Sequence, residues 1–383
     1  MQIQLEKTLD VEIVERELAE LWAQTIDRRE PDFDDATVLR ARVANLLVFV
    51  ANESLLSETD PLMQELTTRH PSRVLLMMGD RQAANVDIEM FVSSFCQTDK
   101  RTGVKRLCCE EITLKARGNF TSELPSAALP LLVPDLSTFL WWRDVFRVFD
   151  RVFMTLASAA GRLIIDSAEF ANPEAELGEV NKLFEHDLAK DLGISDLNWA
   201  RLTWWRSLLA DFYDVPAYRP LLDQIDYVEI HYVAPEHAPE AKAPQALLLA
   251  GWLASRVAWN YQNAESYGEA VFFNFTSSDN RAVKLELRRV EQGERKPGRL
   301  VKVELRSSAQ QEASFRVERS ADDLYLLTEA RLGPTTHRGR VLPVRNRSAV
   351  QLLSREIEIL CNDDIYQEAL AMVGRMIDLK SPS

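Results

Sequence analysis

The chain has 383 residues, of which 46% are hydrophobic and 27% are charged, so the composition is that of an ordinary globular protein with about two domains. The formal net charge is −14, which disfavours general binding to nucleic acid or anionic lipid because both are anionic themselves. No apolar run approaches the roughly 18 residues of a membrane span.

The first 170 residues predict an N-terminal α/β domain with a mostly parallel sheet. Residues 11–27 have the spacing of an amphipathic helix. Apolar runs at 43–50 and 74–78 predict buried strands, with a helix opening at Asp60–Pro61 between them. Further strands are expected at 88–97, 107–115, 139–142 and 163–165, and a helix is expected over 145–158.

Residues 171–383 predict an α+β domain with a helical layer, an antiparallel meander and terminal helices. Asn172 followed by Pro173 is typical of a helix start, and Gly193 is expected to end that helix. A helix over 200–212, a strand over 227–233 and a buried helix over 245–259 follow. From residue 270 apolar and polar residues alternate, which predicts strands with one solvated face. Ser348 and Gln351 form a capping box that begins the terminal helices.

Sequence motifs for catalysis are not found. The chain contains no GxSxG, phosphate-loop or GxGxxG pattern. Of the five histidines only His231 and His237 are close in sequence, and no further ligand lies at short spacing, so neither a metal site nor a cofactor is expected. Asp166 ends the strand expected at 163–165. It is a candidate ligand-binding group, because α/β folds place such groups at the carboxyl ends of strands; a plain strand-ending cap is the alternative.

Two Trp-Trp-Arg triplets stand out, Trp141-Trp142-Arg143 and Trp204-Trp205-Arg206. Neighbouring residues point to opposite sides of a strand and diverge by about 100° on a helix, so each pair needs two burial sites. Trp and Arg are enriched at interface hot spots, which makes all six candidates for partner binding. Packing between the α/β domain and the helical layer is the alternative.

Positive charge gathers between Arg281 and Arg347, where 16 Lys/Arg face 9 Asp/Glu, a net of +7. Lys284, Arg288 and Lys302 are expected on the solvated side of the meander. Arg288 and Lys302 are therefore candidates for contact with an acidic partner. The alternative is a solvated surface of mixed charge, in which these cations pair with neighbouring glutamates.

Several segments resemble the signature blocks of the OpcA family of glucose-6-phosphate dehydrogenase assembly proteins. The segments that resemble signature blocks are LLVPDLSTFLWWRD, RLIIDSAEF, DLNWARLTWWRSLLADFYD and ALLLAGWLASRVAW. RVANLLVFV, HPSRVLLM and CCEEITLKARG are similar to the N-terminal blocks. They occur in family order between about residues 40 and 260. One departure is Asp135–Phe139, which reads DLSTF where the family pattern has a proline after Asp-Leu.

The resemblance implies a non-catalytic assembly factor and allosteric activator that binds glucose-6-phosphate dehydrogenase of the oxidative pentose phosphate pathway. Two alternatives stay open. One is a sugar-phosphate-binding enzyme using Asp166, Arg162 and His70, and the other is a scaffold without effect on turnover.

The cysteines and the N-terminus predict a cytoplasmic protein. The N-terminus lacks the cationic and apolar stretches of a secretion signal. Four cysteines in so long a chain do not indicate a disulfide framework. Some relatives are linked to thioredoxin-type control. Cys361 is the only cysteine of the C-terminal half, so a disulfide confined to that half is excluded.

Overall fold

The computed structural model describes residues 2–4, 11–27, 37–40, 42–98, 105–308, 312–344, 347–359 and 362–377. The chain forms two compact units, each assembled from several segments. The first contains Met1–Ile165, His186–Ser195 and Ser348–Asn362, and the second contains Asp166–Glu185, Asp196–Arg347 and Asp363–Ser383. A boundary between independently folding domains at residue 170 stays a prediction.

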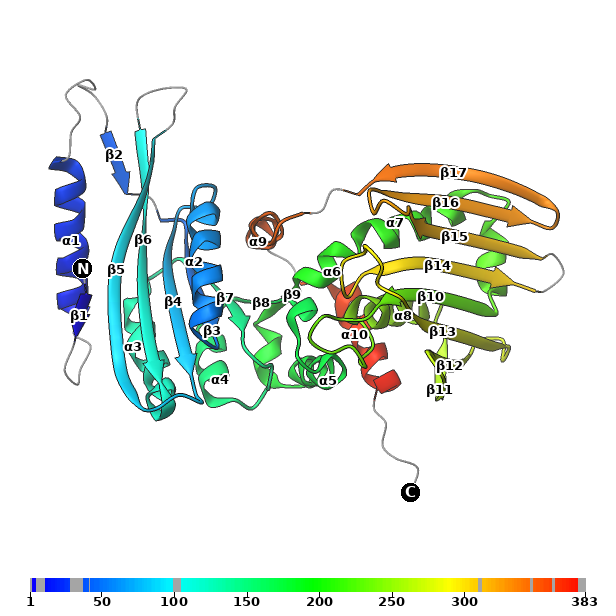
Figure 1. Ribbon diagram of the computed structural model, residues 1–383, viewed down its shortest axis with the longest axis horizontal. Coiled ribbons are helices and arrows are strands. Elements are labelled where there is room, and N and C mark those ends of the chain that lie inside the picture. The colour runs from blue at the N-terminus through cyan, green and yellow to red at the C-terminus, as the bar shows by residue number, and fades with distance from the viewer. Residues whose placement is uncertain are drawn as a thin grey trace. The chain divides into compact units, whose positions relative to one another are not determined.

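One mixed sheet forms the centre of the first unit (Figure 1). Its strands are β1 (Gln2–Gln4), β2 (Thr37–Arg40), β3 (Ala44–Val50), β4 (Ser72–Asp80), β5 (Val86–Thr98), β6 (Lys105–Arg117), β7 (Ser137–Arg143), β8 (Arg162–Ile165) and β9 (Gly193–Asp196). The spatial order is β1-β5-β6-β4-β3-β7-β8-β9, with β2 beside β6. Strands β6, β4, β3, β7 and β8 run parallel, whereas β5 and β1 are antiparallel to their neighbours. The predicted mostly parallel sheet is therefore confirmed.

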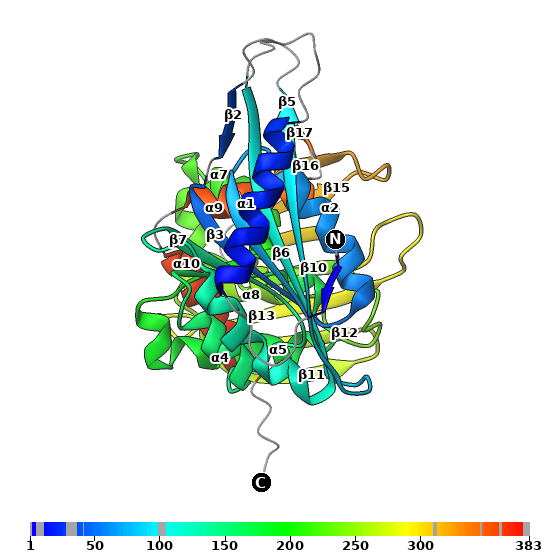
Figure 2. The same cartoon turned by 90° about the vertical axis from the view of Figure 1, so that its left-hand side faces the viewer.

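Helices cover this sheet because its central strands are apolar on both sides. Strand β3 is buried along its whole length, as its continuous apolar run predicts. Helix α1 packs against β5 (Figure 2), and α2 packs against β4 and α9. The helices are α1 (Val11–Asp27), α2 (Glu53–Thr67), α3 (Leu124–Ala128), α4 (Arg151–Ala157) and α9 (Ala349–Glu358).

Two helix starts in the first unit differ from the sequence prediction. Helix α2 begins at Glu53 rather than at Asp60, because the Asn52 side chain caps it by accepting from Leu55 N at 3.0 Å, and Pro61 lies inside the helix. Helix α4 begins at Arg151 rather than at residue 145. Asp150 is its cap and accepts from Phe153 N at 3.0 Å, which leaves residues 144–150 as a loop.

The second unit is built on a sheet of order β11-β12-β13-β10-β14-β15-β16-β17. Neighbours are antiparallel except β10 and β13, which run parallel. The meander predicted from residue 270 is thus confirmed, but β10 lies inside it. The strands are β10 (Tyr227–Val233), β11 (Asn260–Tyr267), β12 (Ala270–Thr276), β13 (Ala282–Val290), β14 (Leu300–Ser307), β15 (Ala313–Arg319), β16 (Tyr325–Leu332) and β17 (Thr335–Pro343).

Helices of the second unit pack on one side of this sheet. Phe212, Tyr213 and Tyr218 all contact Phe315 of β15, with ring centroids 5.2–5.3 Å apart. Helix α8 is buried nearly all round, as its sequence predicts, and α10 packs against it. The helices are α5 (Pro173–Phe184), α6 (Leu197–Arg201), α7 (Thr203–Asp211), α8 (Pro244–Arg256) and α10 (Asp364–Ile377), with the 3-10 turns η5 (Phe212–Asp214) and η6 (Arg219–Gln224).

The helix ends agree with the sequence prediction at the start of α9 but not at α5. The Ser348–Gln351 capping box is present at the start of α9. At α5 the Asn172 side chain makes no capping bond; Asn172 N instead donates to the Glu176 carboxylate at 2.9 Å. Helix α5 ends at Phe184 rather than near Gly193, and Gly193 begins β9. Within the described part of the chain, no helix is long and apolar enough to cross a membrane.

Candidate functional site

The first Trp-Trp-Arg triplet lies inside the first unit. On β7 the two rings point to opposite sides of the sheet, as strand geometry requires. Trp142 stacks on Phe49 at 4.4 Å, whereas Trp141 lies with apolar residues of α2 and α9. The Arg143 guanidinium lies 4.9 Å from the Trp141 ring and donates to Thr59 Oγ1 at 2.5 Å. All three residues are buried, so the triplet holds the sheet to helices within its own unit.

The second triplet lies in α7 of the second unit and is only partly buried. Trp205 is buried, while 41% of Trp204 is exposed. The Arg206 guanidinium lies 3.6 Å from the Trp199 ring centroid, and burial lowers its pKa to about 10. Of the four triplet tryptophans only Trp204 therefore presents an exposed ring. Partner binding through the triplets stays a prediction, and it now rests on Trp204.

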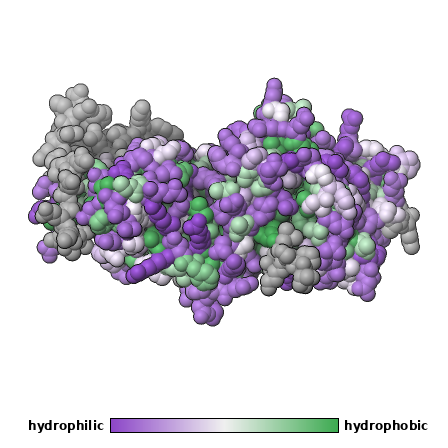
Figure 3. Space-filling model, turned by 60° about the horizontal axis from the view of Figure 1, so that its bottom comes forward, coloured by the Kyte–Doolittle hydropathy of each residue, from purple (hydrophilic) through white to green (hydrophobic). Residues whose placement is uncertain are grey.

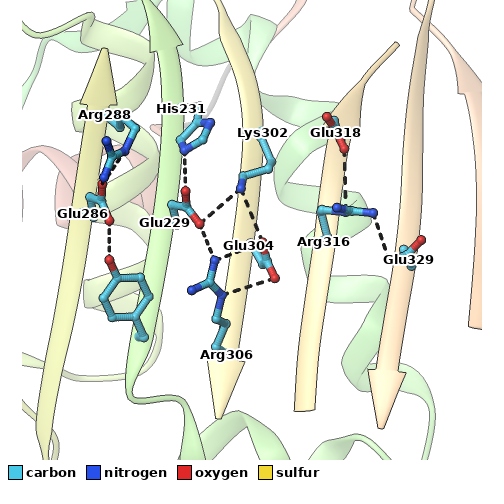
Figure 4. Close-up of polar contacts among 11 residues, drawn as sticks. Glu229, His231, Glu286, Arg288, Lys302, Glu304, Arg306, Arg316, Glu318 and Glu329 are labelled. Atoms are coloured by element: carbon cyan, nitrogen blue, oxygen red, sulfur yellow. Dashed lines mark hydrogen bonds and ion pairs between the residues drawn. The ribbon is translucent and has the colours of Figure 1, made fainter. Parts of the chain in front are cut away.

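One face of the second sheet carries a lattice of charged side chains (Figure 4), which we name the charged face. It arises from period-two alternation: Val228 and Ile230 of β10 point into the core, so Glu229 points to the other side. The same alternation operates on the neighbouring strands. The face comprises Tyr227, Glu229, His231, Lys284, Glu286, Arg288, Lys302, Glu304, Arg306, Arg316, Glu318 and Glu329.

Strand register places three glutamates side by side at the centre of the charged face. Glu229 of β10 lies opposite Glu286 of β13 on one side and Glu304 of β14 on the other. Like charges directly opposite one another destabilise a sheet, so this acidic row needs compensation.

The rows on either side of the glutamates supply that compensation. One row contains Arg288, His231 and Lys302, and the other contains Lys284, Tyr227 and Arg306. An acidic row therefore lies between two predominantly cationic ones.

Close contacts bind these rows together. Glu229 contacts His231 Nε2 and Arg306 Nη2 at 2.5 Å each, and Lys302 Nζ at 3.1 Å. The hydrogen bond with His231, followed by the interactions with Lys302, lowers the Glu229 pKa to about 2, so this carboxylate is ionised at neutral pH.

The outer glutamates of the acidic row have their own partners. The Arg288 guanidinium and the Tyr227 hydroxyl both donate to Glu286. Desolvation, followed by that hydrogen bond, raises the Tyr227 pKa. Glu304 contacts Arg306 Nε at 3.2 Å. Farther along the sheet, Arg316 contacts Glu329 at 2.9 Å and Glu318 at 3.7 Å.

The charged face is balanced rather than basic. Its five Lys/Arg residues match its five glutamates, so the formal sum is zero with His231 neutral. The mixed-charge alternative thus describes this surface. Lys302 is also less accessible than its sequence pattern predicts: only 16% of its side chain is exposed, against 46% for Arg288. It lies between Glu229 and Glu304, which cover it.

Asp166, the candidate ligand-binding residue, is paired within the second unit. Its two carboxylate oxygens accept from Nη1 and Nη2 of Arg201 at 2.6 and 2.8 Å, a bidentate pair. It also caps a short 3-10 turn by accepting from Ala168 N. A ligand role for Asp166 stays a prediction, and a ligand would have to replace Arg201.

The other residues of the enzyme alternative also have local partners. His70 contacts Ser354 Oγ of α9 at 2.6 Å, and Arg162 donates to Ser195 Oγ at 2.9 Å. Cys109 is free and buried, with a raised pKa caused chiefly by desolvation. Cys361 lies outside the described residues. Among the described residues no group of three or more His, Cys, Asp and Glu side chains could hold a metal ion.

The fold resembles that of a solved oxidoreductase. KijD10, a 3-ketoreductase from Actinomadura kijaniata in complex with TDP-benzene and NADP, matches with a TM-score of 0.50 and 9% identity, covering 88% of this chain and 96% of that one. At this identity the likeness shows the fold alone. The chain is an α/β protein in which a mostly parallel sheet is followed by a large, mostly antiparallel one.

Comparison of the sequence with models of protein families is more specific than this structural likeness. The model described as glucose-6-phosphate dehydrogenase subunit N-terminal domain matches residues 63–182, and the model of the C-terminal domain of that subunit matches residues 192–370. The chain belongs to the OpcA family.

Two curated relatives carry the same family name. A putative OxPP cycle protein OpcA of Nostoc punctiforme is 32% identical over 59% of this chain and 47% of its own length, so the match spans about half of that relative. The OpcA protein of Synechocystis is 26% identical over 84% of this chain and 67% of its own length.

Proposed function

We propose that this chain is a cytoplasmic, non-catalytic assembly factor and allosteric activator of glucose-6-phosphate dehydrogenase. The observation that carries the proposal is the pair of family matches, because both are described as domains of a glucose-6-phosphate dehydrogenase subunit and together they lie in both structural units. An activator must bind the active state of its partner better than the inactive state.

The turn after β3 supports a non-catalytic role. In dinucleotide-binding α/β proteins the corresponding strand-to-helix turn is glycine-rich, so that a pyrophosphate can approach the helix N-terminus. Here the turn reads Ala51-Asn52-Glu53-Ser54 and contains no glycine. The Glu53 carboxylate lies in the first turn of α2, where it contacts Lys115 Nζ at 2.7 Å and Arg117 Nη2 at 3.6 Å. A protein carboxylate thus lies at the helix end that a cofactor phosphate would use.

We further propose that the charged face contributes to docking, with Arg288 as its accessible cation. Paired charges of fixed register give specificity rather than strong net attraction, because a misplaced partner would leave charges unmatched. Lys302 would act by holding Glu229 and Glu304 in place.

The test measures initial rates of the dehydrogenase from the same organism with increasing amounts of the chain. We expect a KM for glucose-6-phosphate at least fivefold lower at saturation, since allosteric coupling of about 1–3 kcal/mol corresponds to roughly 5–150-fold changes in affinity. Heat-denatured chain is the control. The chain alone should oxidise no glucose-6-phosphate with either nicotinamide cofactor. Unchanged kinetics despite binding shown by calorimetry would leave only the scaffold role.

A further inference from the structure

The loop from Asp144 to Asp150 exposes apolar side chains on a fixed backbone. It follows β7 at the carboxyl end of the parallel strands, the edge where α/β sheets bind their ligands. Within it Phe146 and Val148 are buried, whereas Val145, Arg147 and Phe149 point outward. Phe149 is 75% exposed and Val145 is 38% exposed. The loop therefore presents an apolar-cationic-apolar row to solvent.

A single guanidinium holds both ends of this loop. Arg81 contacts Asp144 at 3.2 Å and Asp150 at 2.9 Å, so the first and last loop residues are tied to one point. Asp150 also caps α4, and Asp150 N donates to the Arg147 carbonyl at 3.0 Å. The buried Phe146 ring packs edge-on against Phe153 at 5.0 Å. These contacts fix the backbone beneath the exposed residues.

Charge near the loop is arranged asymmetrically. Both aspartates face Arg81, and their side chains are only 11% and 16% exposed. The outward charges of this segment are cationic, namely Arg147 and the first residue of α4, Arg151. A complementary partner would offer an apolar socket with carboxylates at its rim.

We infer that this loop is a docking anchor that inserts Phe149 into an apolar socket on glucose-6-phosphate dehydrogenase. The inference rests on the proposed function, and the loop lies within the residues that match the N-terminal domain of the dehydrogenase subunit. Hydrophobic residues in the surface view lie in small patches on a mostly hydrophilic surface (Figure 3). Aromatic residues held rigidly lose little conformational entropy on binding, which is why preorganised aromatic anchors dominate interface energies.

The test compares dissociation constants for the dehydrogenase, measured by calorimetry with the full chain. Phe149→Ser should weaken binding about 30-fold or more, the loss typical of a central aromatic hot spot. Val43→Ser is the matched control. Val43 is 57% exposed at the amino edge of the same sheet, so its loss should change binding less than threefold. Arg81→Gln should weaken binding roughly 3–10-fold through lost preorganisation while Phe149 is retained.

The outcomes separate this inference from the proposed function. If the parent chain binds the dehydrogenase and Phe149→Ser binds equally well, the anchor is wrong and the proposed function stands. If the parent chain does not bind at all, both fail. Sedimentation of the chain alone tests whether Phe149 instead contacts a second copy of the chain. If Phe149→Ser loses self-association but still binds the dehydrogenase, Phe149 contacts a second copy and the inference is overturned. Circular dichroism of each variant confirms folding.

Discussion

At the scale of single residues, the Asp196 carboxylate both caps a helix and is buried, and these two features shift its pKa in opposite directions. Its carboxylate Oδ1 accepts from Asn198 N at 2.8 Å and from Ser167 N at 3.0 Å, so it fixes the start of α6. The residue is buried, and desolvation, followed by repulsion from Asp166, raises its pKa to about 6. The capping hydrogen bonds lower the pKa of Asp196, but desolvation raises it by more.

This raised pKa predicts how pH affects stability. The folded state holds the proton more tightly than the unfolded chain, whose aspartates titrate near pH 3.9. The Asp196 contribution to stability should therefore fall as pH rises from about 4 to about 6, by roughly 3 kcal/mol in total. Asp196→Asn cannot ionise, so its free energy of unfolding relative to the parent should increase over that range. Urea unfolding at pH 4.5 and 7.5 measures this.

The control for the Asp196 experiment is Asp223→Asn, which makes the same chemical change at an exposed position. Its free energy of unfolding should differ from that of the parent by the same amount at both pH values. If Asp196→Asn behaves in the same way, the Asp196 carboxylate titrates at its ordinary pKa and the assignment is wrong.

At the scale of elements, the close approach of α8 and α10 depends on one glycine. A Cβ added at Gly251 would lie 2.3 Å from the Ala369 carbonyl oxygen and 2.7 Å from Val373 Cγ2. Backbone cannot move away as a flexible side chain can, so the two helices would have to separate. Gly178 of α5 differs, because its nearest neighbour would be Ile377 Cδ1 at 3.7 Å, an ordinary contact.

These two glycines make a matched pair for substitution. Gly251→Ala should lower the free energy of unfolding by about 1–3 kcal/mol, the usual result of overpacking. Gly178→Ala should be neutral or stabilise by up to about 1 kcal/mol, because alanine is the better helix former. Urea unfolding of both variants measures the difference. A Gly251→Ala protein as stable as the parent would show that α8 and α10 are loosely packed.

At the scale of the whole molecule, the uneven distribution of charge affects how partners associate. The region 281–347 carries the positive excess, yet the charged face, which combines residues of this region with Glu229 of β10, is neutral. Exposed cations outside this face include Lys296, Arg338 and Arg340. Long-range attraction to an acidic partner depends on net charge, whereas close docking depends on the pattern of the lattice.

Charge reversal at Arg288 tests docking through the charged face. Arg288→Glu leaves Glu286 beside a second carboxylate and makes the face acidic, so association with the dehydrogenase at low salt should slow about 3–10-fold. The effect should shrink in 0.5 M salt, because the Debye length is about 10 Å at 0.1 M and decreases further with ionic strength. Stopped-flow measurements at both salt concentrations give the rates.

Arg219→Glu on η6 is the control, since this exposed residue belongs to the helical side of the same unit. Both variants change the net charge equally, so a difference between their association rates must come from the position of the reversed charge. Equal association rates for the two at both salt concentrations would exclude Arg288 from the docking surface.

Most helices and strands can be predicted from the sequence alone, because local periodicity indicates which side of an element is buried. It identified β10, the alternating strands after residue 270 and the capping box of α9. Seven blocks in family order also indicate the family, but they do not show which residues contact the partner, because they are rich in core residues. The start of α4 differs from the sequence prediction, because the apolar residues of 145–149 also fit a helical spacing, whereas the cap of the helix is Asp150.

The contacts between segments distant in sequence follow from the tertiary structure and not from local patterns. The acidic row of Glu286, Glu229 and Glu304 exists because β10 lies between β13 and β14, a register set by long-range pairing that periodicity does not encode. The outward position of Phe149 likewise depends on Arg81, which lies more than 60 residues earlier in the chain and holds both ends of the loop. Local sequence records whether a side chain is apolar; the fold decides whether neighbouring atoms cover it.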